Sequence, residues 1–198
     1  VEGERIQLAE NSVIDVTGGS GGGDILVGGD WHGGAKEELR VLDNPYKMYQ
    51  ASEVMMNENA LIDASAVLDG DGGTVVLWSD ILNTNSVTSV LGEIYAEGGK
   101  SGGNGGKVET SGYFLDINHA RVSTLAPYGK TGDWLLDPGH IRITTTGTDE
   151  NDGLPGSIDG TTDINPTSIS NALDSNNVSL ATGSGNYDLT VTNGLTNS

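Results

Sequence analysis

Short apolar runs, rich in β-branched residues, recur along the chain between glycine-rich segments; residues 75–78 (VVLW) are one of them. Alternate positions in these regions are apolar, which is the period of a β-strand with one buried face. The run WLL at 134–136 lies between Gly132 and Pro138, and a helix could not pass through these two residues without a large loss of stability. We therefore predict short strands, with residues 137–139 (DPG) as the corner that ends the strand at 134–136.

The pattern repeats along the chain. The segment RIQLAENSVIDVTG from Arg5 aligns with EVMMNENALIDASA from Glu53 at an offset of 48 residues. A third copy, FLDINHARVSTL, begins at Phe114, and a degenerate copy, VTSVLGEIYAEGG, is centred on Ile94. Each copy leads through a glycine-rich loop into another short apolar run. The repeating unit is therefore a strand, a turn containing Asn or His, a strand, a glycine loop and a third strand.

About three short strands per repeat with irregular connections are typical of a parallel β-solenoid, or β-helix, in which equivalent strands stack about 4.8 Å apart. We therefore predict an all-β fold in which residues 1–198 form a single segment of about six or seven coils. The inward side chains of such coils line up in ladders. Two ladders are expected: Ile14, Ile62, Ile94 and Val122 in one, and Ile25, Val75, Val108 and Trp134 in the other.

Two stretches interrupt the repeat. Residues 31–50 read as a protruding excursion with a short helical turn at 36–39, and residues 146–163 as an acidic surface loop. After the second interruption, Asn165 can cap a helix and Pro166 suits its first position, so one short helix is expected before the chain returns to strands near residues 178–180 and 187–192.

The charge balance excludes one class of partner. The chain has 9 Lys and Arg against 28 Asp and Glu, a formal net charge of −19. No nucleic-acid partner is therefore expected, and binding to an anionic membrane surface is disfavoured. No run approaches the roughly 20 apolar residues of a membrane span, so no membrane insertion is expected. The chain has no cysteine, and it begins at Val1 with neither a start methionine nor a signal peptide, which predicts a portion of a longer protein.

The titratable residues do not form a recognisable catalytic motif. His32, His119 and His140 fall in predicted turns and have no Ser or Cys partner in a nucleophile motif. Asp15 and Asp63 occupy a repeated corner, where a side-chain bond to a turn amide is expected rather than acid–base work. We therefore predict that the protein is not an enzyme. A polysaccharide-active β-helix enzyme stays open as an alternative, favoured if three or more acids from adjacent coils converge with a Lys or Arg in one groove.

No cofactor is expected. The segment GGSGGGDIL from Gly18 approaches a calcium nonapeptide, but Asp24 stands one position late and no tandem copy follows. Incidental calcium binding by the acidic loops is left open. Asn177 begins the sequon Asn-Val-Ser and is a candidate glycosylation site. Trp31 and Trp78 hold the same phase after their strands, where packing in a corner is favoured over stacking on sugars.

Several motifs carry a family resemblance: ILVGGDWHG (25–33), ALIDASA (60–66), GDGGTVVLWSD (70–80), GGKVETSGYFLDI (105–117) and GKTGDWLLDPGHIRI (129–143). Together they resemble two-partner-secretion exoproteins of the filamentous haemagglutinin and high-molecular-weight adhesin family of Gram-negative bacteria. The likeness covers nearly the whole chain. It corresponds to a segment C-terminal to the family's secretion domain, and the motifs of that domain are not visible in this sequence.

The resemblance implies a right-handed parallel β-helix at the surface of a Gram-negative bacterium, exported through an outer-membrane partner pore. It implies adhesion to host or bacterial surface glycans or proteins, or to matrix. Because the coils are committed to stacking, we expect any ligand to meet one of the two interruptions, with Trp31, Lys36, Arg40 and Lys47 as candidate contacts. End-to-end self-association is expected if the terminal coils stay uncapped. A structural stalk without its own ligand remains an alternative.

Overall fold

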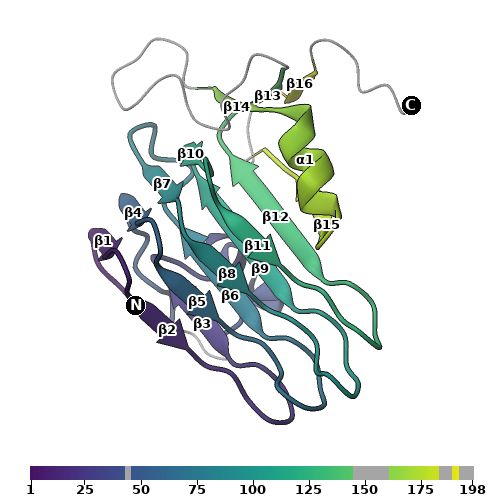
Figure 1. Ribbon diagram of the computed structural model, residues 1–198. Helices are drawn as coiled ribbons and strands as arrows, with labels where there is room; N and C mark the ends of the chain where they lie inside the picture. Colours follow the sequence, from purple (N-terminus) through teal and green to yellow (C-terminus); the bar gives the residue numbers. More distant parts are fainter. Residues whose placement is uncertain (43–45, 145–160, 183–188, 192–198) are drawn as a thin grey trace.

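The computed structural model describes residues 1–42, 46–144, 161–182 and 189–191. These residues form an all-β chain with one short α-helix, and every pairing between named strands is parallel. Figure 1 shows equivalent strands side by side in rows that run from purple at the N-terminus to green. The prediction of an all-β fold with parallel strands and a short helix is confirmed. No helix in the described part of the chain is long and apolar enough to span a membrane.

Four sheets hold the strands. The first has the order β1 (Arg5–Leu8), β4 (Glu53–Met56), β7 (Val87–Val90) and β10 (Phe114–Asp116). The second has the order β11 (Arg121–Ser123), β8 (Glu93–Tyr95), β5 (Leu61–Asp63) and β2 (Val13–Asp15). The third has the order β15 (Asn177–Leu180), β12 (Asp133–Pro138), β9 (Lys107–Gly112), β6 (Thr74–Trp78) and β3 (Asp24–Val27). The fourth has the order β14 (Thr162–Ile164), β13 (Ile141–Ile143) and β16 (Leu189–Val191).

The chain visits the first three sheets in a fixed order. From β1 to β12, successive strands enter the first, second and third sheet in turn, so the described residues contain four triplets of strands. About six or seven coils were expected for the whole chain; among the described residues after β12, β13, β14 and β16 form the fourth sheet and β15 joins the third.

Both predicted ladders are present. In the second sheet Ile62 pairs with Ile14 on one side and Ile94 on the other, and Ile94 pairs with Val122. In the third sheet the paired residues are Ile25, Val75, Val108 and Trp134. Ile62 and Ile94 are fully buried in one apolar core enclosed by the sheets. The offset of 48 residues is thus the register of β1 against β4 and of β2 against β5.

The corner acids hold turns, as predicted. Oδ1 of Asp15 accepts a hydrogen bond from the backbone N–H of Thr17 at 2.8 Å, and Oδ1 of Asp63 accepts one from Ser65 at 2.9 Å. The turns before β2, β5 and β11 contain Asn11, Asn59 and His119, with positive φ values of 61°, 59° and 71°. Asparagine and histidine tolerate this left-handed backbone better than most residues, which explains their place in the repeat.

The glycine loops lie so close to one another that side chains are excluded. A Cβ added at Gly106 would lie 2.0 Å from the carbonyl oxygen of Gly73, and one added at Gly132 would lie 2.0 Å from that of Gly106. The backbone of each loop therefore rests directly on the loop before it, immediately ahead of the strands of the third sheet.

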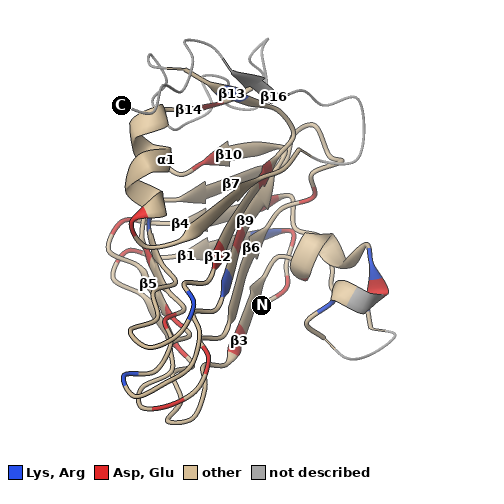
Figure 2. Cartoon of the chain, turned by 90° about the vertical axis from the view of Figure 1, so that its right-hand side faces the viewer, with Lys and Arg blue, Asp and Glu red and all other residues tan. Residues whose placement is uncertain are grey.

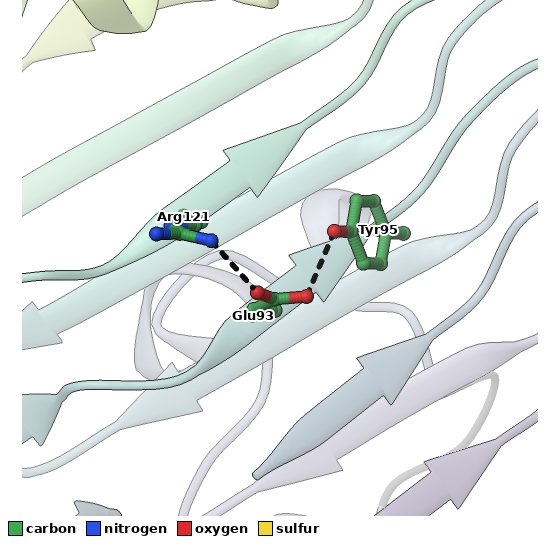
Figure 3. A network of polar contacts seen from close by, with 3 residues as sticks. All are labelled: Glu93, Tyr95 and Arg121. Atoms are coloured by element: carbon green, nitrogen blue, oxygen red, sulfur yellow. Dashed lines mark hydrogen bonds and ion pairs between the residues drawn. The ribbon is translucent and has the colours of Figure 1, made fainter. Parts of the chain in front are cut away.

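The outer face of the second sheet carries a cross-strand polar network. Arg121 on β11 forms an ion pair of 3.2 Å with Glu93 on β8, and the hydroxyl of Tyr95 donates to the same carboxylate at 2.9 Å (Figure 3). Arg121 and Glu93 are register partners. Such exposed ion pairs contribute little to stability. The stability of the sheets therefore comes mainly from the buried side chains of the ladders.

The C-terminal part corrects two predictions. Strand β12 continues through Asp137 and Pro138, which pair with Ser111 and Gly112, so the predicted corner at 137–139 belongs mostly to the strand. Residues 146–160 of the predicted acidic loop lie outside the described residues. Thr162 and Asp163, the last two residues of that prediction, belong to strand β14.

The short helix forms as predicted. Helix α1 spans Pro166–Leu173, and the side chain of Asn165 caps it by accepting a hydrogen bond from the N–H of Thr167 at 2.9 Å. The following strand, β15, adds to the edge of the third sheet beside β12.

Candidate functional site

The excursion at 31–50 has a packed inner side. It contains two 3₁₀ turns, Trp31–Gly34 and Glu37–Leu39, the second of which confirms the expected helical turn. Figure 2 shows these turns standing beside the third sheet, near β3 and β6. A small apolar cluster lies between excursion and sheet; it contains Leu26, Met48, Val76, Trp78 and Ile81, with Trp31, Val41 and Leu42 packed against it. The excursion therefore covers the outer face of the sheet as well as projecting from it.

Asp30 anchors the excursion at its base. Its Oδ1 accepts hydrogen bonds from the backbone N–H groups of Trp31 at 2.7 Å and Val41 at 2.8 Å, and its Oδ2 accepts one from Leu42 at 3.2 Å. Asp30 is only 2% exposed. A buried carboxylate that receives three N–H groups stabilises the fold of the loop around it.

The four predicted contact residues divide into two kinds. Trp31 is half-buried, with its ring edge-on to His32, and Arg40 donates from Nε to the carbonyl of Gly34 at 2.8 Å. Both side chains thus take part in the packing of the excursion. Lys36 and Lys47 are exposed and can contact another molecule.

Two exposed tyrosines lie near Lys47 on the outer side, and no motif in the sequence marks them as contact residues. Tyr46 and Tyr49 are 54% and 51% exposed, and their hydroxyl groups donate to the carboxylates of Glu2 and Glu4. These five residues line a shallow depression of about 440 Å³. The hydrogen bonds from the tyrosines lower the pKa of both glutamates, so the rim of the depression is anionic.

Beneath the excursion lies a cluster of three titratable side chains from different parts of the chain. His32 belongs to the first 3₁₀ turn, Glu109 to β9 and Asp137 to β12. One donor atom from each lies within 4.8 Å of the other two. Glu109 is fully buried and Asp137 is 5% exposed, because both occupy outward positions of the sheet that the excursion covers.

Burial sets the protonation of this cluster. It raises the pKa of Glu109 to about 8, although the N–H of His32 donates to Oε2 at 2.8 Å and the hydroxyl of Ser111 donates to Oε1 at 2.9 Å. Burial likewise raises the pKa of Asp137 to about 6. It lowers the pKa of His32, helped by the nearby charge of Lys36, so the imidazole is neutral at pH 7.

The cluster does not form the open groove that a polysaccharide-active enzyme needs. Three acids do converge here: Asp30 follows β3, Glu109 lies on β9 and Asp137 on β12, close enough for the charges of Asp30 and Asp137 to act on Glu109. All three are buried under the excursion, however, with exposures of 2%, 0% and 5%. A polymer could not reach these carboxylates without displacing the excursion.

The remaining candidates lie elsewhere. Asn177 is exposed at the start of β15, and its Nδ2 donates to the carbonyl of Thr131 at 2.8 Å. A groove of about 490 Å³ lies between α1 and the strands β11, β12 and β15, with Trp134, Ile169 and Ala172 among its apolar walls. His119 lies in a turn at the edge of this groove, as the sequence analysis expected for a turn residue.

Comparison with known proteins adds no assignment. No protein-family model matches the chain, and no curated protein matches it.

Proposed function

We propose that the chain is a segment of a secreted, fibrous, cell-surface adhesin of the filamentous haemagglutinin and high-molecular-weight adhesin type, folded as a right-handed parallel β-helix. The triplets of parallel strands that enter three sheets in fixed order support the β-helix, because each triplet then corresponds to one coil. The motifs that resemble this family lie on those strands and on the glycine loops between them.

The observation that carries adhesion is the position of the excursion. Its inner side is fixed to the third sheet, while Lys36, Tyr46, Lys47 and Tyr49 are exposed on its outer side. Aromatic side chains next to cations are suited to contact with glycans or with protein surfaces, since they combine apolar area with hydrogen-bond donors. A rigid stack that presents such a segment sideways is the arrangement expected of an adhesive rod.

The ends of the stack support the expected association with further chain. Strands β1, β2 and β3 are the outermost strands of three sheets, so each has one edge without a partner strand among the described residues. Unpaired edges favour pairing with another strand. We propose that flanking coils of a longer protein, or a second copy bound end to end, continue the stack.

The remaining parts of the proposal follow the family resemblance. The protein would reach the bacterial surface through an outer-membrane partner pore and would act outside the cell without catalysis. The absence of cysteine suits passage in an unfolded state followed by coil-by-coil folding. Asn177 is the proposed glycosylation site, and the intact mass of the secreted protein against its Asn177→Gln variant would test it.

Binding of the purified segment to glycan arrays and to intact host and bacterial cells tests adhesion. Shortening the excursion would uncover Val76 and Trp78, so the variant to use is Lys36→Ser with Lys47→Ser, both exposed. The matched control is Lys100→Ser with Lys130→Ser, two exposed lysines in the glycine loops. Adhesion that is lost only in the first variant supports the proposal. A folded segment that binds nothing would make it a stalk.

A further inference from the structure

Two aspartates lie buried beneath the excursion, and their surroundings differ. Asp30 accepts three backbone N–H groups. Asp137, which is 95% buried, has an Oδ1 with no hydrogen-bond partner. An ionised oxygen in that position is strongly disfavoured unless a positive charge lies next to it. The neighbours of Asp137 should therefore show what supplies that charge.

Two neighbours of Asp137 have side chains of types that commonly bind metal ions. The imidazole of His32 and the carboxylate of Glu109 each offer a donor atom, and these atoms and one of Asp137 lie within 4.8 Å of one another. Two strands and the excursion thus bring three ligands to one point. In a tetrahedral site with metal–ligand distances of about 2 Å, donors are roughly 3.3 Å apart, so modest side-chain rotations would close the site.

We propose that His32, Glu109 and Asp137 bind one divalent transition-metal ion, for which Zn²⁺ is the best fit, and that this ion fastens the excursion to the third sheet. One imidazole and two carboxylates provide three ligands, and a water molecule completes the tetrahedron. Calcium does not fit, because it takes six to eight oxygen ligands and the cluster includes a nitrogen. The proposal does not depend on adhesion and differs from the incidental calcium considered for the acidic loops.

The groups around the cluster suit a bound cation. Ser111 and the backbone N–H of His32 donate to the two oxygens of Glu109 and so fix the orientation of this ligand. The lowered pKa of His32 leaves the imidazole in its neutral, metal-binding form. The raised pKa values of Glu109 and Asp137 describe the site without an ion; a cation would take the place of the proton.

The test uses the 198-residue chain, freed of metal with a chelator and then titrated with Zn²⁺, Ca²⁺ or Mg²⁺. We expect one tightly bound Zn²⁺ per chain and a clear rise in Tm with Zn²⁺ that Ca²⁺ and Mg²⁺ do not give. Cobalt should bind at the same site and show the visible absorption of a four-coordinate ion. A chain that binds no Zn²⁺, or that Ca²⁺ stabilises equally, overturns the proposal.

Matched variants locate the ion. His32→Asn and His119→Asn each replace a histidine of positive φ by a residue that tolerates that backbone, so neither should disturb the fold. We expect His32→Asn and Asp137→Asn to lose the Zn²⁺-dependent rise in Tm, and His119→Asn to keep it. Ser111→Ala should weaken binding about 10-fold or more, because it removes a hydrogen bond to a ligand. Unchanged binding in both His32→Asn and Asp137→Asn overturns the proposal.

Discussion

The backbone N–H of His32 donates a hydrogen bond of 2.8 Å to Oε2 of Glu109, 77 residues later in the chain. His32 follows β3, whereas Glu109 lies on β9, two strands away in the same sheet. The excursion therefore reaches across β6 and connects the first triplet of strands with the third on the outer face of the sheet. In an array whose repeats otherwise contact only their neighbours, such a connection couples the stability of non-adjacent units.

Replacement of Asp30 should release the excursion before it affects the sheets. Asp30→Ala leaves three partly buried N–H groups without their acceptor and should lower the free energy of unfolding by about 3 kcal/mol. Asp30→Asn keeps one acceptor oxygen and should cost about half of that. Limited proteolysis within residues 31–50 and urea unfolding measure the two effects. Equal protease resistance in all three proteins would show that Asp30 is not the anchor.

The ladders were predictable because the signal is local. Ile14 and Ile62 share their place relative to the following Asp in VIDV and LIDA, and the register of the strands follows directly from that alignment. The end of β12 was missed because Asp137 and Pro138 resemble a turn, although pairing with β9 keeps them in the strand. Among the described residues, the apolar strands after β12 enter the fourth sheet or the edge of the third, although their sequences look like those of the earlier triplets.

The buried cluster could not be found from the sequence. Glu109 and Asp137 occupy outward strand positions, which the repeat pattern assigns to solvent. They are buried only because the excursion folds back over the sheet, and nothing local in residues 31–50 shows that it does so. The sequence offers one signal. Val76 and Leu135, the register partners of Glu109, are apolar at the same outward position, and apolar residues there indicate that another segment covers this face of the sheet.

A methyl group at Gly106 should disrupt the stack of glycine loops. The added Cβ of Gly106→Ala would lie 2.0 Å from the carbonyl oxygen of Gly73, which belongs to backbone and cannot move aside cheaply. We expect a loss of about 3 kcal/mol or more, or failure to fold. Gly19→Ala is the control, because a Cβ there meets nothing within 4 Å. Thermal unfolding compares the two, and equal Tm values would contradict the close packing of the loops.

The ladder of the second sheet should contribute less to stability at its edge strand, β2, than at its centre. Ile62 is fully buried between Ile14 and Ile94, so Ile62→Ala should lower the free energy of unfolding by about 3 to 4 kcal/mol. Ile14 is half-buried on the edge strand β2, so Ile14→Ala should cost about 1 kcal/mol. Urea denaturation of both variants measures the difference. If both variants lost the same free energy of unfolding, the edge position Ile14 would contribute as much as the central position Ile62, which contradicts the prediction.

The metal-free chain should lose stability as the pH rises, and Glu109 should account for much of the loss. Its pKa is about 8 in the folded chain against an ordinary 4.5, so between these values the folded state holds a proton that the unfolded state releases. The free energy of unfolding therefore falls with rising pH across this window, by at most about 1.4 kcal/mol per pH unit for one group. Asp137, raised from 3.8 to about 6, adds to the fall in the lower part of the window.

The variant that tests this linkage is Glu109→Gln, which is neutral at every pH and can keep a hydrogen bond from the N–H of His32. In urea titrations with a chelator at pH 5, 6, 7 and 8, the free energy of unfolding of Glu109→Gln should rise relative to that of the wild type as the pH increases, and the variant should be the more stable protein at pH 8. Glu10→Gln, at an exposed glutamate, should follow the wild type throughout. If the wild-type and Glu109→Gln curves run parallel, Glu109 is already ionised in the folded chain, and some charge beside it must compensate for its burial.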